Sequence, residues 1–257
     1  YIIIMSKINE NGFWEGTEAS SQHRYDKALS DALLTFFKTE KVKTLCDFGC
    51  GMGSYVQHLK DNNLNISGYD GNPNTPELTN YTCNILDLSK PIKFKSPFSW
   101  VMYLEVGEHL PKKFEDIFIN NLHNNNEHGI VLSWALKGQG GDGHFNEQNN
   151  DYIKSKICKL GYINDIETEE LLRKHSTLKW FKNTIMVFRK VYFYSQDNYK
   201  LYNPIPKNLT IIYKESGQLC NALKNFISCQ RLSNHFGCSF LRGTLSRRSL
   251  VSLFLVT

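Results

Sequence analysis

The sequence predicts an α/β protein built on a doubly wound, mostly parallel sheet. Two observations support this fold class. Short apolar runs alternate with amphipathic helical stretches between residues 24 and 190. A glycine-rich turn at residues 47–53 also joins an apolar strand to the start of a helix. The chain has 257 residues, 41% of them hydrophobic, which suffices for one such domain with an appendage and excludes a disordered chain.

The first predicted elements are a helix over residues 24–38, a strand over 44–48 and a helix over 54–60. Apolar residues in the first helix recur on one face, at Ala28, Leu29, Ala32, Leu33, Phe36 and Phe37. Three polar side chains precede or begin it: His23, Tyr25 and Asp26. They either face the functional site or, for Asp26, only favour the helix N-terminus.

The glycine-rich turn reads D-x-G-x-G-x-G from Asp47, with glycines at 49, 51 and 53. Glycine permits a backbone with positive φ and a close approach by a ligand. A dinucleotide turn instead requires G-x-G-x-x-G. Its third glycine would fall at position 54, which is Ser54. A glycine-rich turn without any ligand is the alternative interpretation.

Asp70 ends a predicted strand over residues 65–70, and it follows Gly51 by 19 residues. An acidic residue at about this distance accepts hydrogen bonds from ribose hydroxyls in nucleotide-binding folds. Residues 71–74, which include Pro73, break the chain immediately afterwards. Both cofactor classes share this acid, so it supports nucleoside binding without choosing between them.

The remaining elements complete the predicted sheet. The run 98–104 is almost continuously apolar, as in a parallel strand buried on both faces. The other predicted segments are strands at 81–88 and 130–135, helices at 112–123 and 151–160, a turn at 124–129, and closing strands at 171–181 and 184–189.

Two motifs together resemble the class I S-adenosylmethionine-dependent methyltransferases: the D-x-G-x-G-x-G turn and the Leu104–Leu110 segment, which reads L-E-V-G-E-H-L. The second is similar to the segment after the fourth strand in small-molecule methyltransferases. The resemblance runs from about Trp14 to Lys190. It implies a Rossmann-like sheet of the seven-stranded methyltransferase type, with S-adenosyl-L-methionine as cofactor and a small molecule as methyl acceptor.

The resemblance also implies a set of cofactor contacts. Asp47 would hold the amino end of the cofactor and Glu105 its methionine end. Asp87 would accept from the adenine amino group, or it would instead cap the turn that follows. The full predicted set is Asp47, Gly49, Cys50, Gly51, Gly53, Asp70, Gly71, Asp87, Leu88 and Glu105.

The candidate catalytic residues are His144, Glu108 and His109. His144 lies in a glycine-rich loop after the fifth predicted strand, and histidine ordinarily titrates near neutral pH. It acts as general base or is a loop histidine bonded to its own backbone. Glu108 and His109 bind an acceptor or a divalent ion, or Glu108 caps the next helix while His109 packs beneath it. No metal ligand set is predicted.

Charge is unevenly spread along the chain. Residues 191–257 carry eight basic and two acidic residues, whereas residues 1–190 carry 22 basic and 23 acidic residues. The body therefore lacks the basic stripe of a nucleic-acid binder, and we expect a small-molecule partner and no nucleic acid. The alternatives are a methyltransferase acting on protein or RNA, steered by the basic tail, and a non-catalytic cofactor-binding protein.

Seven cysteines without a regular framework indicate reduced thiols and a cytoplasmic location. Cys46 and Cys50 form a C-x3-C pair, but no second pair is nearby to complete a zinc site. The apolar stretches at 1–5 and 250–256 are too short to span a membrane, and no membrane partner is expected.

Three regions are predicted: an N-terminal segment over 1–22, the methyltransferase domain over 23–190, and a weakly ordered C-terminal extension over 191–257. The chain starts with Tyr1, so we also expect that it is a fragment. Neither the acceptor nor the oligomeric state follows from the sequence.

Overall fold

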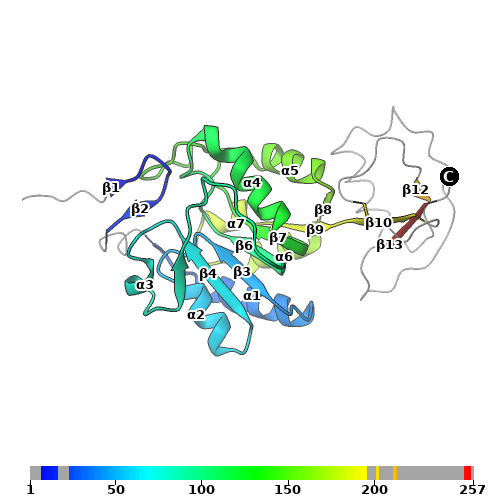
Figure 1. Cartoon of the computed structure of the whole chain (residues 1–257), viewed down its shortest axis with the longest axis horizontal. Helices are drawn as coiled ribbons and strands as arrows, with labels where there is room; N and C mark the ends of the chain where they lie inside the picture. The colour runs from blue at the N-terminus through cyan, green and yellow to red at the C-terminus, as the bar shows by residue number, and fades with distance from the viewer. Residues whose placement is uncertain (1–6, 17–22, 196–200, 203–210, 213–251, 256–257) are drawn as a thin grey trace, which may run out of the picture. The chain divides into compact units, whose positions relative to one another are not determined.

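A computed structural model describes residues 7–16, 23–195, 201–202, 211–212 and 252–255. Its main sheet has seven strands in the order β5–β4–β3–β6–β7–β9–β8 (Figure 1). The predicted fold class, a Rossmann-like sheet of mostly parallel strands, is confirmed. The chain forms two compact units, residues 1–150 with 166–187, and residues 151–165 with 188–257.

The sheet of the first unit is parallel throughout its described pairings. Strand β3 (Leu45–Phe48) lies between β4 (Ile66–Asp70) and β6 (Phe98–Tyr103). Strand β5 (Cys83–Ile85) pairs with β4, and β7 (Asn126–Leu132) pairs with β6. Because parallel strands all end at the same edge, the loops after β3, β4, β5, β6 and β7 meet there.

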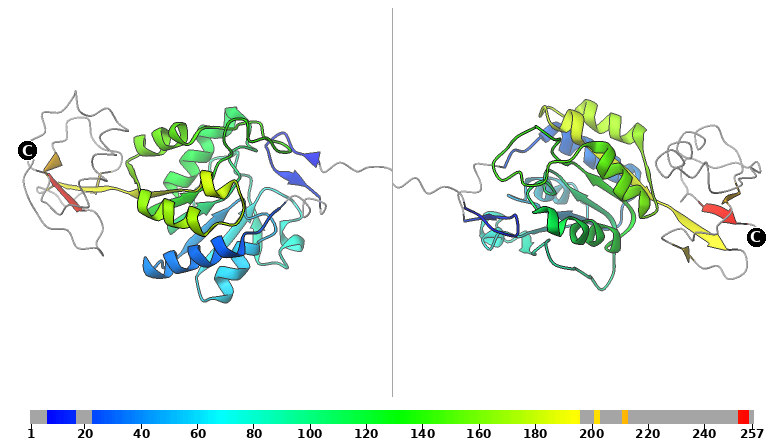
Figure 2. Two further views of the ribbon diagram at one scale, coloured as in Figure 1. Left: turned by 180° about the vertical axis from the view of Figure 1, so that it is seen from behind. Right: turned by 90° about the horizontal axis from the view of Figure 1, so that it is seen from above.

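Helices cover both faces of this sheet (Figures 1 and 2). Helix α1 (Lys27–Thr39) contacts α2 (Ser54–Asp61) and α6 (Ile166–His175). Helix α4 (Glu115–Asn124), which follows a 3-10 turn at Lys112–Phe114, lies on the opposite face. The two short helices are α3 (Thr75–Leu78) and α7 (Phe181–Thr184).

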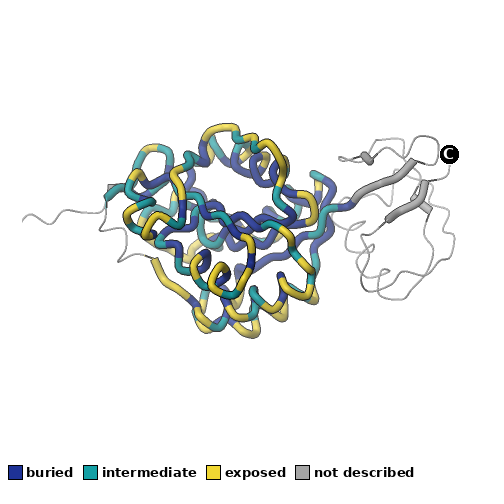
Figure 3. Tube along the Cα trace, turned by 60° about the horizontal axis from the view of Figure 1, so that its bottom comes forward, coloured by how far each residue is buried: buried dark blue, intermediate teal, exposed yellow. Residues whose placement is uncertain are grey.

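The core lies between α1 and the central strands. In Figure 3 the buried residues gather in the interior of the trace. Leu33 and Phe37 of α1 are fully buried, and Trp100 of β6 is 2% exposed. The Phe36 ring meets the Trp100 ring edge-on, with centroids 5.1 Å apart. The apolar face of the predicted first helix is therefore the face that packs on the sheet.

Asp26 caps the N-terminus of α1 and is fully buried. Its carboxylate accepts hydrogen bonds from the backbone N–H groups of Leu29 at 3.0 Å, Thr177 at 2.6 Å and Leu178 at 2.9 Å. Burial acts to raise the pKa of Asp26, but these hydrogen bonds outweigh burial and lower it. Asp26 therefore acts as the N-cap of α1, which is the second of the two roles considered for it.

Two predicted segments are wrong. Residues 171–181, predicted as a closing strand, are helical in α6 and at the start of α7. The first turn of α6 is acidic and the last turn basic, and Glu169 pairs with Arg173 at 2.9 Å, all of which favour a helix. The turn predicted at 124–129 is also too long, because β7 already begins at Asn126.

The second unit contains most of α5 (Asn150–Lys159), β8 (Tyr162–Asn164) and the end of β9 (Met186–Lys190). Strands β8 and β9 are antiparallel, with Ile163 opposite Arg189. A separate sheet has the strand order β11–β10–β13–β12, formed by Leu201–Tyr202, Tyr192–Ser195, Ser252–Leu255 and Ile211–Ile212.

The predicted region boundaries at 22/23 and 190/191 remain predictions. Most of residues 191–257, and residues 1–6 and 17–22, lie outside the described residues. So do Cys220, Cys229 and Cys238, whereas the four described cysteines are unbridged. Within the described part of the chain, no helix is both long and apolar enough to cross a lipid bilayer.

Candidate functional site

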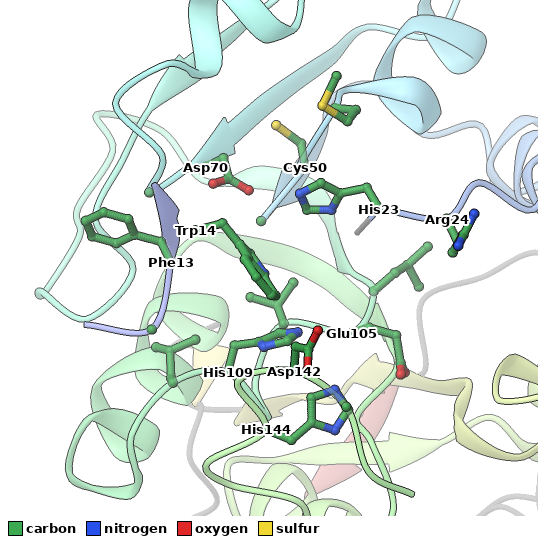
Figure 4. A pocket seen from close by; sticks show the side chains of 18 of the residues that line it. Phe13, Trp14, His23, Arg24, Cys50, Asp70, Glu105, His109, Asp142 and His144 are labelled. Carbon is green, nitrogen blue, oxygen red and sulfur yellow. The ribbon is translucent and has the colours of Figure 1, made fainter. Parts of the chain in front are cut away.

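A cavity of about 580 Å³ lies at the carboxyl edge of the sheet in the first unit (Figure 4). Loops that follow β3, β4, β6 and β7 contribute to its walls, together with residues 11–14 and 23–25. The predicted site residues that line it are Asp47, Gly49, Cys50, Asp70, Gly71, Leu88, Glu105, His109 and His144. Four further predicted site residues do not line it: Gly51, Gly53, Asp87 and Glu108.

The glycine turn has the positive φ angles that its sequence predicts: +80° at Gly49, +52° at Gly51 and +69° at Gly53. It is fastened to the neighbouring strand because the N–H groups of Gly49 and Cys50 both donate to the carbonyl of Tyr69, at 2.7 and 3.0 Å. Gly53 is then the N-cap of α2. Backbone hydrogen bonds to the neighbouring strand therefore hold the start of the turn in place.

Each glycine of the turn faces a side chain of the protein. A Cβ at Gly49 would collide with the Val106 side chain, and one at Gly51 would lie 2.6 Å from the His23 ring. A Cβ at Gly53 would come within 3.1 Å of the Thr79 side chain. A ligand can therefore reach Gly51 only after the exposed His23 ring has moved aside.

Asp70 points toward the glycine turn. Its Oδ2 accepts a hydrogen bond from the N–H of Gly51, and its Oδ1 accepts one from the N–H of Asn72, both at 2.9 Å. Each carboxylate oxygen has a second lone pair for a further donor. Asp70 thus both fastens the turn and presents acceptor capacity to the cavity that it lines.

The other two predicted aspartates of the cofactor region differ from each other. Asp47 lines the cavity at the end of β3, and burial raises its pKa well above the ordinary value. Asp87 instead accepts from the N–H and hydroxyl of Ser89, at 3.0 and 2.6 Å, and from Asn11 at 3.1 Å. The geometry at Asp87 is that of a turn cap, while its neighbour Leu88 lines the cavity.

Glu105 begins the loop after β6 in a left-handed conformation, with φ +53°. Its carboxylate accepts from the Gln139 amide at 3.0 Å and from the Thr184 hydroxyl at 3.3 Å. Burial raises the pKa of Glu105, while these hydrogen bonds act in the opposite direction. Glu105 therefore links the loops after β6 and β7 at the cavity wall.

The structure brings the three candidate catalytic residues together. Glu108, His109 and His144 each place one ligand-type atom within 4.8 Å of the others. The His109 and His144 rings meet edge-on with centroids 4.9 Å apart, on the same side of the cavity (Figure 4). The carbonyl of Glu108 accepts from the N–H groups of Phe145 and Asn146, at 2.8 and 2.9 Å, which fixes the two loops to each other.

The Glu108 carboxylate is fully buried, and neither of its oxygens has a hydrogen-bond partner among the residues that the structure describes. Burial raises its pKa well above the ordinary value, and the nearby Glu105 charge raises it further. The N–H groups of Glu108 and Ala135 are close enough to lower that pKa. Neither of them meets the geometry of a hydrogen bond to the carboxylate.

Both histidine rings are oriented through Nδ1. His109 Nδ1 lies 3.1 Å from the carbonyl oxygen of Gly143, and His144 Nδ1 lies 2.9 Å from Oε1 of Glu147. Glu147 also accepts from the N–H groups of Gly138 and Gly140, both at 2.7 Å. Burial lowers the pKa of His109 to about 4, and the neighbouring His144 acts in the same direction.

Residues 21–132 match the family model described as a methyltransferase domain. The match covers 112 of the 257 residues and supports the class I S-adenosylmethionine-dependent methyltransferase superfamily. It indicates S-adenosyl-L-methionine as the cofactor. A search of curated proteins finds no match.

Several solved structures are similar to this methyltransferase. Magnesium protoporphyrin IX methyltransferase from Synechocystis, with bound S-adenosylhomocysteine, is 15% identical with a TM-score of 0.46, covering 68% of this chain and 84% of the other. The methyltransferase domain of a bacterial Hen1 protein is 18% identical with a TM-score of 0.46, covering 68% and 99%. The [4+2]-cyclase SpnF is 13% identical with a TM-score of 0.45, covering 62% and 80%.

The methyltransferase cavity also has a wall that the sequence did not predict. A hairpin of β1 (Lys7–Ile8) and β2 (Trp14–Glu15) contributes residues 11–14 to the lining. The Phe13 side chain lies against Gly71, and the Trp14 ring meets the His109 ring with centroids 5.9 Å apart. Asn72 donates to the carbonyl of Gly16 at 3.0 Å. A tryptophan in a polar stretch was the only signal for this element.

The far wall of the methyltransferase cavity includes Trp180 and Phe181. Both belong to the segment predicted as a strand, so their place in the site was missed together with their secondary structure. Gln139, Gly140, Gly141 and Asp142 of the glycine-rich loop line the cavity as well. The composition of that loop was a usable signal, because a glycine-rich loop after a strand is a common place for ligand contacts.

Proposed function

We propose that this methyltransferase transfers the methyl group of S-adenosylmethionine to a small-molecule acceptor. One observation carries the proposal: a single cavity reaches from Asp47, Cys50 and Asp70 to His144 and Trp180. Its volume of about 580 Å³ is within the usual range for small-molecule sites. Cofactor and acceptor would therefore share one cavity.

The cofactor half of the cavity has a defined set of contacts in this proposal. Asp70 accepts from the ribose hydroxyls, because its oxygens keep spare lone pairs beside the glycine turn. Asp47 and Glu105 hold the amino and methionine end, and Leu88 packs on the adenine. The His23 ring swings off Gly51 when the cofactor enters.

The reaction in this proposal is an in-line displacement. A lone pair of the acceptor attacks the methyl carbon, the carbon–sulfur bond breaks, and S-adenosylhomocysteine leaves with the electron pair. A neutral acceptor must also lose a proton. Alignment of the reacting groups is worth about 7–11 kcal/mol in favourable cases, and a general base adds about 10²–10⁴-fold.

His144 is the base that the geometry favours. Glu147 is 2.9 Å from its Nδ1, which orients the ring and favours the tautomer with the proton on that nitrogen. Nε2 is then the nitrogen that accepts the proton from the acceptor. The neighbouring His109 helps to shape the acceptor side of the cavity.

A paired experiment tests the proposal. Calorimetry should show binding of S-adenosylhomocysteine and none of NADH. A radiolabelled methyl assay should then label a component of a metabolite extract but not RNA or protein fractions. Label confined to RNA or protein would show that the acceptor is a macromolecule and not a small molecule. Cofactor binding without any labelled product would favour a non-catalytic binding protein.

His144→Ala tests the base. We expect turnover to fall by about 10²–10⁴-fold, with little change in affinity for S-adenosylhomocysteine. His128→Ala is the matched control, because His128 is exposed on β7 and lies outside the cavity lining. Wild-type turnover in His144→Ala would remove this residue from the mechanism.

A further inference from the structure

We propose that Glu108, His109 and His144 bind one divalent first-row transition-metal ion at the acceptor side of the cavity. The inference goes beyond the proposed methyl transfer, since it concerns a second ligand with a site of its own. It rests on the position of three donor groups and on a buried carboxylate that the protein leaves without a partner.

The donor groups are close enough for one ion. One ligand atom from each side chain lies within 4.8 Å of the others. Two ligands at about 2.1 Å from a common ion lie at most about 4.2 Å apart. Three ligands around one ion are mutually about 3.4–3.6 Å apart at that distance, so side-chain rotations that move each donor atom inward by up to about 0.7 Å complete the site.

Both imidazoles are arranged as metal-binding histidines usually are. Such a histidine has one ring nitrogen fixed by a carbonyl or carboxylate, so that the other is free for the ion. Here Nδ1 of His109 faces the Gly143 carbonyl and Nδ1 of His144 faces Glu147. Among the described residues, neither Nε2 has a hydrogen-bond partner, which leaves one nitrogen of each ring for the ion.

Glu108 is the observation that points to a ligand. Its carboxylate is fully buried, and neither oxygen is hydrogen-bonded within the described part of the chain. An unpaired buried carboxylate is costly, and such groups are normally paired or bound to a metal. Glu105 adds a second acidic group nearby. A cation among these residues would offset both the burial and the repulsion.

The donor set selects the class of ion. Two imidazole nitrogens with one carboxylate oxygen suit Mn²⁺, Fe²⁺, Co²⁺ or Zn²⁺, and the mixture is less suited to Ca²⁺, which prefers oxygen ligands alone. The cluster contains no thiolate, unlike most structural zinc sites. Cys46 and Cys50, the pair considered for zinc, are not members of it.

Three protein ligands leave at least one coordination position open. His109 and His144 line the cavity, so an open position on that side would accept a water molecule or an acceptor oxygen. A cation makes such an oxygen ligand more acidic. With the ion on its Nε2, His144 no longer accepts a proton, so the ion would replace the base and not assist it.

Metal titration of the full chain tests the site. The protein is first dialysed against a chelator and then titrated with Mn²⁺, Co²⁺ or Zn²⁺ in a calorimeter, and with Co²⁺ in a visible spectrometer. We expect one ion per chain, with absorption bands typical of nitrogen and oxygen ligands. Glu108→Gln and His109→Ala should each weaken binding by at least about 10-fold, whereas His128→Ala should not.

Two checks keep the test decisive. Thermal unfolding of wild type and His128→Ala should shift to higher temperature with the ion, and that shift should vanish in Glu108→Gln, which preserves the volume of the side chain. Binding of S-adenosylhomocysteine should persist in each variant, which separates failure of this site from failure of the proposed function. No binding of any of the three ions, or binding that Glu108→Gln and His109→Ala leave intact, would overturn the proposal.

Discussion

The carboxylates at the two ends of the cavity differ in their hydrogen bonding. At the glycine turn, both oxygens of Asp70 accept backbone N–H groups, from Gly51 and Asn72. At the other end, both oxygens of Glu108 are buried without a hydrogen bond to any described residue. The carboxylate at the glycine turn is thus paired with backbone donors, whereas that of Glu108 has no partner in the described part of the chain.

This difference distinguishes a preorganised binding surface from one whose polar atoms are unpaired. The turn at Gly49–Gly53 is fixed by backbone hydrogen bonds to Tyr69 and by the Asp70 carboxylate. Rigid placement of this kind lowers the cost of binding. The loops also hold the side chains at the acceptor end in place. In our proposals, the donor atoms of Glu108, His109 and His144 interact with a bound partner.

The largest effect should come from breaking the preorganised end with Gly51→Val. Gly51 has φ +52°, and a Cβ there would lie 2.6 Å from the His23 ring. A branched side chain would also occupy the space beside Asp70. We expect affinity for S-adenosylhomocysteine to fall by at least about 100-fold, or by more than about 2.7 kcal/mol, in calorimetry.

Gly138→Val is the matched control for backbone strain. Gly138 has φ +86°, but nothing lies within 4 Å of a Cβ built on it. It is also absent from the cavity lining. If both variants bind S-adenosylhomocysteine as wild type does, the cofactor does not lie against Gly51.

A second variant tests a buried carboxylate that is fully satisfied. Asp26→Asn would place an amide NH2 opposite the N–H groups of Thr177 and Leu178, which now donate to Oδ2 at 2.6 and 2.9 Å. We expect the free energy of unfolding at pH 7 to fall by about 1.5–3 kcal/mol, the range for hydrogen bonds to charged groups. Urea unfolding measures this change.

The pH dependence of that loss has a definite sign. The pKa of Asp26 is lowered in the folded protein, so its stabilising effect is fully present above the unfolded pKa of about 3.9. The effect is lost as the pH falls through the lower, folded value. Wild type and Asp26→Asn should therefore differ by a constant amount from pH 5 to 7 and converge below about pH 4. A difference that grows toward low pH would contradict the assignment.

A smaller effect is expected from His23→Ala. The His23 ring lies where a Cβ on Gly51 would point, and its displacement should oppose cofactor entry. Removing the ring should tighten S-adenosylhomocysteine binding by about 2–10-fold, or at most about 1.4 kcal/mol. Arg24→Ala, at an exposed neighbour that also lines the cavity, is the control. Weaker binding in His23→Ala would instead show that the ring contacts the cofactor.

The smallest effect is expected from Glu108→Gln in the presence of a chelator. Glu108 makes no hydrogen bond that the substitution could break, and the amide is neutral and nearly equal in volume. The free energy of unfolding should change by less than about 1 kcal/mol, in contrast to Asp26→Asn. A loss as large as that of Asp26→Asn would mean that Glu108 is already satisfied within the chain.

The preorganised end of the cavity was largely predictable from the sequence. The strand, the turn and α2 are contiguous, and the glycine spacing fixes their geometry. Asp70 follows from the length of one strand–helix–strand unit. Local patterns of this kind are where sequence reasoning is strongest, and the confirmed sheet depends on them.

The acceptor end depends on contacts between distant segments, and no local pattern encodes these. His144 joins Glu108 and His109 only because the Glu108 carbonyl accepts from Phe145 and Asn146. The hairpin was missed because each of its strands has two residues, too few for a periodic pattern. Helix α6 was missed because the apolar pair at Leu171 and Leu172 outweighed the charge pattern around it.

The hairpin at residues 7–16 has a practical consequence for anyone who expresses this protein. Asn11 bonds to Asp87, Gly16 to Asn72, and Trp14 packs on His109, so one short element joins three separate loops. A shortened gene that begins at α1 would encode the whole sheet and the entire glycine turn. The cavity of the truncated product would nevertheless lack the hairpin wall and would be open to bulk water on that side. Crystallisation or ligand screening with that product would therefore report on a different pocket.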